Sequence, residues 1–161
     1  MKKDILKGTT MLVLVVTLAL ATAVISANAQ ATNGKVVANV PFEFSVGYKT
    51  MPAGEYSVQA IPSANGLMIQ SADGKNSALR LSDPTDRVKE KSPARLVFHR
   101  YGERYFLAEV WNGIDNTGRR LTTSQEERAT ESELAAIASA NENAHAPTTA
   151  YQIVEVLAVL H

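Results

Sequence analysis

The sequence predicts a mainly β protein: a single antiparallel β-sandwich or small β-barrel domain of about seven strands, with one α-helix in the C-terminal region, following an N-terminal signal peptide. Three observations predict this class. Between residues 36 and 111 apolar and polar side chains alternate in short runs separated by turn residues. Near residue 124 the period becomes helical. Without the export segment 132 residues remain, enough for one domain with one hydrophobic core.

The first 29 residues have the pattern of a signal peptide. Three lysines stand within the first seven residues, and a 15-residue apolar run, 11–25, follows them. Ala27-Asn28-Ala29 supplies the small residues that a signal peptidase reads, with cleavage before Gln30, and 29–31 offers a second site. The apolar run is shorter than the 18 residues expected of a membrane span. We therefore expect an exported protein, periplasmic or extracellular, with no membrane span after cleavage.

Composition excludes several function classes. The chain has 16 basic and 16 acidic residues, and removal of residues 1–29 leaves a net charge of −2. A protein that tracks nucleic-acid phosphates carries a basic excess, so we expect no nucleic-acid partner. The absence of cysteine excludes disulfides, thiolate zinc sites and a lipid anchor on cysteine. No phosphate loop or dinucleotide fingerprint is present, and we expect no cofactor and no metal.

The first half of the mature chain reads as short strands. Alternation over 40–46 places Val40, Phe42, Phe44 and Val46 on one face; Pro41 cannot donate to a ladder, which favours an edge strand or a bulge. A second strand carries Tyr56, Val58 and Ala60, and a third carries Leu67 and Ile69.

Turn residues bound the next strand. Asp73-Gly74 predicts a hairpin turn that leads into a strand with Leu79 and Leu81. Asp83-Pro84 is expected to end that strand, and the charged segment 83–93 reads as an exposed loop.

The clearest hairpin lies at 94–111. Residues 94–101 and 104–111 flank Gly102-Glu103, a pair suited to a type II′ turn. A two-residue loop fixes the register, with Tyr101 opposite Arg104, Arg100 opposite Tyr105, and Phe98 opposite Leu107. One face then holds Leu96, Phe98, Tyr105, Leu107, Glu109 and Trp111, and the other holds Arg95, Val97, His99, Tyr101, Arg104 and Phe106.

A helix and a last strand complete the domain, which we place at 36–161. Ser124, with Glu127 three residues later, forms a capping-box pattern that opens an acidic helix over about 124–140. Residues 141–149 read as a linker. Residues 151–159 are almost entirely apolar on both faces and read as a strand, with a helix as the alternative.

Few residues offer catalytic chemistry. His99 is either a general base or, as we favour, a hydrogen-bonded strand histidine, and no histidine pair has zinc spacing. Asp73, Asp83 and Asp86 could ligate calcium, but aspartate is also an ordinary turn residue. Glu109 falls on the apolar face, where an unpaired carboxylate is costly. We favour a structural ion pair there, with a cation such as Arg80.

The best candidate binding surface is an aromatic and basic cluster on the hairpin. It contains His99, Arg100, Tyr101, Arg104 and Tyr105, and Glu109 lies on the same predicted strand as Arg104 and Tyr105. Tyrosine and arginine dominate binding hot spots, and they can also stack on sugars or pair with anions. The alternative is a solvated hairpin tip whose arginine stems cover aromatic faces.

Four runs also resemble a group of small exported bacterial proteins of unassigned function. They are VPFEFSVG (40–47), MPAGEY (51–56), IQSADGK (69–75) and ARLVFHRYGERYFLAEVW (94–111). The resemblance covers about 36–128 and implies a signal peptide, a β-rich domain and a charged helical segment. It transfers no catalytic or ligand residue.

Two function classes compete. The first is a non-enzymatic envelope or secreted domain that binds a partner protein, a glycan or a small ligand. The second is a carbohydrate-active or other hydrolytic enzyme that uses Glu109 with a second carboxylate. The sequence leaves open the oligomeric state and the choice between sandwich and barrel.

Overall fold

The computed structural model describes residues 34–86, 92–114, 117–140 and 151–161. The predicted signal peptide and the predicted linker at 141–149 lie outside these residues, as does the middle of the predicted charged loop, 87–91.

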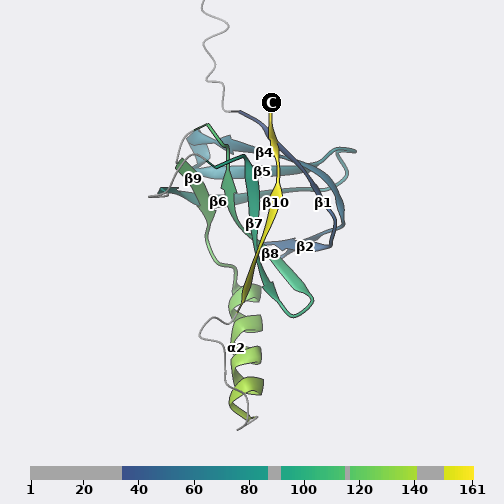
Figure 1. Ribbon diagram of the computed structural model, residues 1–161, viewed down its shortest axis with the longest axis vertical. Helices are drawn as coiled ribbons and strands as arrows, with labels where there is room; N and C mark the ends of the chain where they lie inside the picture. The colour runs from purple at the N-terminus through teal and green to yellow at the C-terminus, as the bar shows by residue number, and fades with distance from the viewer. Residues whose placement is uncertain (1–33, 87–91, 115–116, 141–150) are drawn as a thin grey trace, which may run out of the picture. The chain divides into compact units, whose positions relative to one another are not determined.

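The described residues form one large mixed sheet, mostly antiparallel, and one helix in the C-terminal region (Figure 1). The strands are β1 Val36–Val40, β2 Phe44–Val46, β3 Lys49–Met51, β4 Gly54–Ile61, β5 Gly66–Ser71, β6 Ser77–Asp86, β7 Arg95–Tyr101, β8 Arg104–Trp111, β9 Thr117–Leu121, β10 Gln152–Leu157 and β11 Val159–Leu160. The helices are the 3₁₀ turn η2 Pro62–Ala64 and α2 Gln125–Ala140. The predicted mainly β class with one C-terminal-region helix is confirmed, but eleven described strands replace the predicted seven.

The strand order is β10-β7-β8-β9-β6-β5-β4-β1-β11, and off this path β2 pairs with β8 and β3 pairs with β2. β10 and β11 stand at opposite ends of this order, although only Ala158 separates them in the chain. The Ala158 N–H donates to the carbonyl of Ala94 at 2.9 Å. The C-terminal segment therefore pairs with β7 through one part and with β1 through the next, and the predicted last strand is confirmed.

The core lies against one face of this sheet and is filled by large side chains. Its fully buried members include Val40, Phe44, Met51, Tyr56, Val58, Ile69, Leu96 and Phe98. Aromatic rings meet edge to face within it, with Phe44 5.0 Å from Tyr56 and 5.3 Å from Phe98 between centroids. These large side chains fill the core.

The strand is interrupted at Pro41, within a segment for which the sequence predicted continuous alternation. β1 ends at Val40 and β2 begins at Phe44, so 40–46 is not one strand. Proline has no N–H to continue a ladder. The alternation still marks burial, because Val40, Phe44 and Val46 are buried and Phe42 packs on the edge of the core.

β6 corrects the predicted strand end at Asp83-Pro84. The strand does not end there but runs on to Asp86. Its partner changes from β5 to β9 at Ser82, so Pro84 lies where β6 pairs with β9 alone. A proline is tolerated on a strand with one free edge. Leu79 and Leu81 are 53% and 66% exposed, since Ala78 and Arg80 take the positions opposite Ile69 and Leu67.

The β7–β8 hairpin has the predicted register at its tip and a bulge farther along. Tyr101 pairs with Arg104 and Phe98 with Leu107 as predicted, and Gly102 takes φ of +61°. The register then shifts between Val97 and Phe98, so that Val97 pairs with Glu109. The bulge turns Glu109 and Trp111 away from the Leu96 and Phe98 face. Their predicted placement on the core face is wrong for this reason.

Strand β9 has no predicted counterpart, because its sequence TGRRL contains one apolar residue. Its place is fixed by Gly118, which pairs with Trp111. A Cβ on Gly118 would lie 2.6 Å from the indole ring. The glycine therefore makes room for the buried tryptophan.

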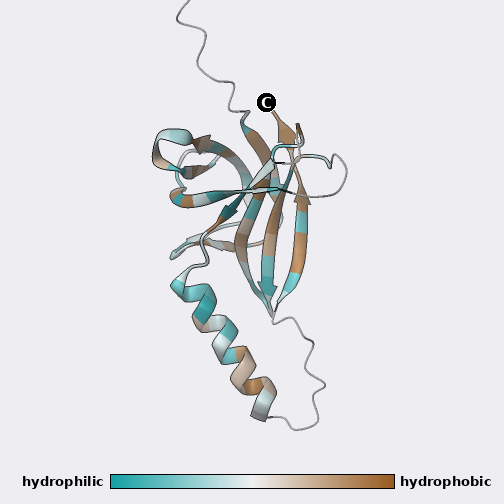
Figure 2. Cartoon of the chain, turned by 90° about the vertical axis from the view of Figure 1, so that its left-hand side faces the viewer, coloured by the Kyte–Doolittle hydropathy of each residue, from teal (hydrophilic) through white to brown (hydrophobic). Residues whose placement is uncertain are grey.

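Helix α2 begins where the capping pattern predicted. Ser124 Oγ accepts the Glu127 N–H at 3.0 Å, as an N-cap does. In Figure 1 the helix starts near the hairpin tip and extends away from the sheet, and Figure 2 shows its first turns as hydrophilic. Ser124, Glu127 and Thr130 are buried, whereas Ile137 is 53% exposed. No helix in the described part of the chain has the length and apolar character to cross a membrane.

Candidate functional site

The structure divides the predicted aromatic and basic cluster between two faces of the hairpin. His99, Tyr101 and Arg104 lie on the face that the first turns of α2 approach, which we call the helix-side face. Arg100 and Tyr105 pair with each other on the core face. Glu109 lies on the helix-side face because of the bulge. The six residues therefore do not form one surface.

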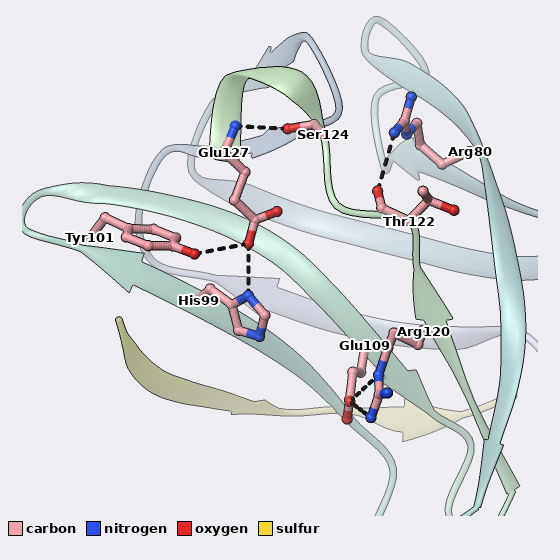
Figure 3. Close-up of polar contacts among 8 residues, drawn as sticks. All are labelled: Arg80, His99, Tyr101, Glu109, Arg120, Thr122, Ser124 and Glu127. Atoms are coloured by element: carbon pink, nitrogen blue, oxygen red, sulfur yellow. Dashed lines mark hydrogen bonds and ion pairs between the residues drawn. The ribbon is translucent and has the colours of Figure 1, made fainter. Parts of the chain in front are cut away.

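A buried carboxylate joins α2 to the hairpin. Glu127 Oε1 lies 2.7 Å from His99 Nδ1 and accepts the Tyr101 hydroxyl at 3.4 Å (Figure 3). The Glu127 side chain is 6% exposed and that of His99 is 22% exposed. A buried charge needs such partners, so these contacts hold the first turn of α2 on the sheet. The favoured interpretation of His99 as a hydrogen-bonded strand histidine agrees with this geometry.

Aromatic packing completes this cluster. The Tyr151 ring stacks on His99 with 3.9 Å between centroids, and it lies 5.5 Å from the Tyr101 ring. Burial, together with the negative charge of Glu127, raises the pKa of the Tyr101 hydroxyl well above its ordinary value. Tyr101 is therefore a neutral hydrogen-bond donor across the ordinary pH range.

Glu109 is held by a structural ion pair. Arg120 donates to its Oε1 through Nε at 3.0 Å and Nη2 at 2.9 Å, and the Trp111 indole N–H donates to Oε2 at 3.0 Å. The favoured interpretation of an ion pair agrees with these contacts, but the cation is Arg120 and not Arg80, which contacts Thr122 (Figure 3). The sequence could not give the partner, because β9 was not predicted. Both carboxylate oxygens are engaged.

A pocket of about 450 Å³ opens beside the hairpin tip. Its lining comes from four parts of the chain: the segment after Pro41, strand β3, the hairpin and the first turn of α2. The lining residues are Phe42, Glu43, Phe44, Ser45, Thr50, Glu103, Arg104, Tyr105 and Glu126. This volume is within the range of ligand-binding pockets. Arg104 and Tyr105 are thus the two predicted binding residues that the structure brings into one pocket.

One wall of the pocket is aromatic. Phe42 stacks on Tyr105 with 4.0 Å between centroids and an interplanar angle of 17°. The Arg100 guanidinium lies 5.4 Å from the centre of the Tyr105 ring. Phe42 also meets the buried Phe98 edge to face at 5.2 Å, so this wall is fixed to the core.

The other wall is charged. Arg104 Nη2 lies 2.9 Å from Glu126 Oε1, and Arg100 Nη2 lies 3.0 Å from Glu103 Oε1. Sequence reasoning missed Phe42, Glu43 and Glu126 as site residues, because they lie far from the hairpin along the chain. The capping pattern located Glu126 on the first helical turn, but sequence could not show which surface that turn approaches.

Among the described residues, no group of three or more histidine, aspartate or glutamate side chains is arranged to hold a metal ion. Asp73 Oδ1 instead accepts bonds from Ser71 Oγ at 2.6 Å and the Lys75 N–H at 3.1 Å, and these bonds lower the pKa of its carboxyl. Asp73 therefore stabilises its own turn.

Comparisons of the chain with protein-family models, with curated proteins and with solved structures find no match.

Proposed function

We propose that this protein is an exported, non-enzymatic binding domain that uses the pocket beside the β7–β8 hairpin tip. The observation that carries the proposal is the pocket itself, which combines a fixed aromatic wall with charged and hydroxyl side chains. Binding pockets characteristically combine such walls with a few polar groups. The export pattern of residues 1–29 supports a periplasmic or extracellular location.

The competing enzyme hypothesis requires a carboxylate that can exchange a proton with a substrate. Glu109 is poorly suited to this role, because Arg120 and Trp111 engage both of its oxygens. We expect Glu109→Gln to lower the free energy of unfolding by about 0.5–1.5 kcal/mol, since the ion pair is partly exposed to solvent. Urea unfolding followed by Trp111 fluorescence measures this loss. An unchanged stability together with loss of a glycosidase activity would favour the enzyme instead.

We also infer that the sheet closes into a small barrel and is not a sandwich. The support is the C-terminal segment, whose two strands pair with β7 and with β1 at the two ends of the strand order. The large core side chains favour a filled interior, which directs the search for a ligand to the external pocket.

A screen of small probes by NMR tests the binding proposal. Short peptides, oligosaccharides and small organic anions are titrated into labelled protein, and the amide shifts of Ser45, Thr50 and Tyr105 are followed. We expect one probe class to shift these amides and Thr50→Trp, which fills the pocket, to abolish the shifts. Thr123→Trp, on an exposed residue outside the pocket lining, is the matched control. Shifts confined to other surfaces would overturn the proposal.

A further inference from the structure

The charges that line the pocket favour a cationic ligand. Three carboxylates, those of Glu43, Glu103 and Glu126, face one guanidinium, that of Arg104. Arg100, beside the lining, pairs with Glu103, so the pocket and this neighbour hold three carboxylates and two guanidinium groups, one negative charge in excess. Like charge repels an anionic ligand and opposite charge favours a cation.

The Arg104 guanidinium in the lining already forms an ion pair within the protein. Arg104 is bound to Glu126 at 2.9 Å, and its guanidinium carbon lies 5.9 Å from the centre of the Phe106 ring. An anion would have to compete with Glu126 for this guanidinium. Among the described residues Glu43 has no ion-pair partner, and Glu103, which is 91% exposed, has only Arg100. The pocket thus holds more carboxylates than cations to pair with them.

The start of α2 could in principle favour an anion, because the N-terminus of a helix is partly positive. Here Glu126 and Glu127 already occupy the first turn, and Ser124 accepts the Glu127 N–H. The two carboxylates counter the partial positive charge of the helix end, and Ser124 caps one of its N–H groups. The helix end therefore does not reverse the preference for a cation.

The remaining lining suits the stem of a long basic side chain. The rings of Phe42 and Tyr105 offer an apolar wall for methylene groups, as lysine and arginine stems require. The hydroxyls of Ser45 and Thr50 can accept hydrogen bonds from an ammonium or guanidinium group. Apolar wall and acceptors thus stand in the same pocket.

One edge of the pocket suits an extended polypeptide. Thr50 lies on β3, and among the described strands β3 pairs with β2 alone. The free edge of a strand can pair with an added strand, and alternate side chains of that strand then enter neighbouring pockets. This edge distinguishes a polypeptide from a free amine such as a polyamine.

We propose that the pocket receives a lysine or arginine side chain of an extended polypeptide partner that lies along the β3 edge. This inference rests on the proposed function and specifies its ligand. Glu43 is the carboxylate assigned to the incoming cation, and Phe42 with Tyr105 contacts its stem.

Calorimetric titration with two matched peptides tests this inference. The first is N-acetyl-Ala-Arg-Ala-amide, and the second replaces arginine with citrulline, a neutral group of similar shape. We expect the arginine peptide to bind about tenfold more tightly than the citrulline peptide, a difference of about 1.4 kcal/mol. Glu43→Gln should weaken arginine-peptide binding about threefold, in line with an exposed ion pair. Glu55→Gln, the same charge change outside the pocket lining, should leave it unchanged.

The outcomes separate this inference from the proposed function. Equal binding of the two peptides, or equal binding of spermidine and the arginine peptide, would overturn the inference. Binding of an oligosaccharide or an organic anion that Thr50→Trp abolishes would also overturn it and would leave the pocket as a binding site. Failure of every probe to shift the pocket amides would overturn both.

Discussion

Glu127 shows how one side chain can organise several elements. Its backbone N–H is capped by Ser124, and its carboxylate reaches His99 and Tyr101 on the neighbouring sheet. The sequence located it as the second member of a capping box, in which glutamate bonds back to the cap residue. In the structure that carboxylate instead binds the hairpin, a role that depends on tertiary packing and leaves no local signal.

Replacement of Glu127 by glutamine should therefore weaken the contact between helix and sheet. We expect a loss of about 1–2 kcal/mol, because hydrogen bonds to a buried charged group are replaced by neutral ones. Thermal or urea unfolding measures the loss. Glu103→Gln is the matched control and should change stability by less than about 0.5 kcal/mol, since that side chain is 91% exposed. Equal effects of the two variants would contradict the role given to Glu127.

From the raised pKa of the Tyr101 hydroxyl we predict that the free energy of unfolding depends on pH in the alkaline range. Its pKa in the folded protein is raised by burial and by Glu127, whereas the unfolded chain has a value of about 10. The folded state then binds the proton more tightly, so stability is full below about pH 10 and falls as pH rises above it. Urea unfolding at a series of alkaline pH values should show this decline in the wild type and a shallower decline in Tyr101→Phe. Identical slopes would contradict the assignment.

At the scale of elements, the sequence predicted those whose signals are local. The hairpin at 94–111, the helix after Ser124 and the strand near the C-terminus follow from turn chemistry, capping and apolar runs. Strand β9 and the bulge on β8 could not be predicted in this way. β9 carries two arginines and one apolar residue, so it lacks the apolar alternation of a strand, and the bulge adds one residue to a strand whose alternation looks regular.

The candidate site was predictable only in part, for the same reason. Arg104 and Tyr105 belong to a hairpin that sequence could place, and their residue types suggested binding. Phe42, Glu43 and Glu126 join them only because Pro41 ends β1 and because α2 begins beside the hairpin tip. Such proximity between distant segments is set by the fold and not by local pattern.

The pairing of β8 with β9 makes a prediction at Gly118. A methyl group there would lie 2.6 Å from the buried indole of Trp111, so Gly118→Ala should cost about 1–3 kcal/mol through overpacking. Gly102→Ala is the useful contrast: it meets no atom within 4 Å and bears only the strain of its φ of +61°. Because Trp111 is the single tryptophan, its fluorescence maximum should shift in the Gly118 variant alone. A shift in both variants would contradict this packing.

At the scale of the whole molecule, the C-terminal segment links the first strand, β1, to the β7–β8 hairpin. Lys35 and His161 exchange backbone hydrogen bonds of 3.0 and 2.8 Å. The Leu160 side chain occupies the space that a Cβ on Gly34 would take. The same segment pairs with β7 through Gln152–Leu157. This arrangement underlies the proposed barrel closure.

A chain truncated after Ala158 tests that arrangement. Loss of β11 removes its pairing with Val36 and Val37 and the half-buried Leu160 side chain. We expect the free energy of unfolding to fall by about 2–3 kcal/mol and the amides of β1 to exchange hydrogen faster. Leu157→Ser, on a side chain that is 70% exposed, should have a small effect. Unchanged exchange in β1 after truncation would contradict closure through this segment.

Intermolecular NOEs test most directly whether the pocket beside the hairpin tip receives a basic side chain. The protein is saturated with N-acetyl-Ala-Arg-Ala-amide, and NOEs from the arginine side-chain methylenes are assigned. We predict NOEs to the ring protons of Phe42 and Tyr105, which form the aromatic wall of the pocket. NOEs to the rings of His99 and Tyr151 instead, or none at saturation, would contradict this proposal.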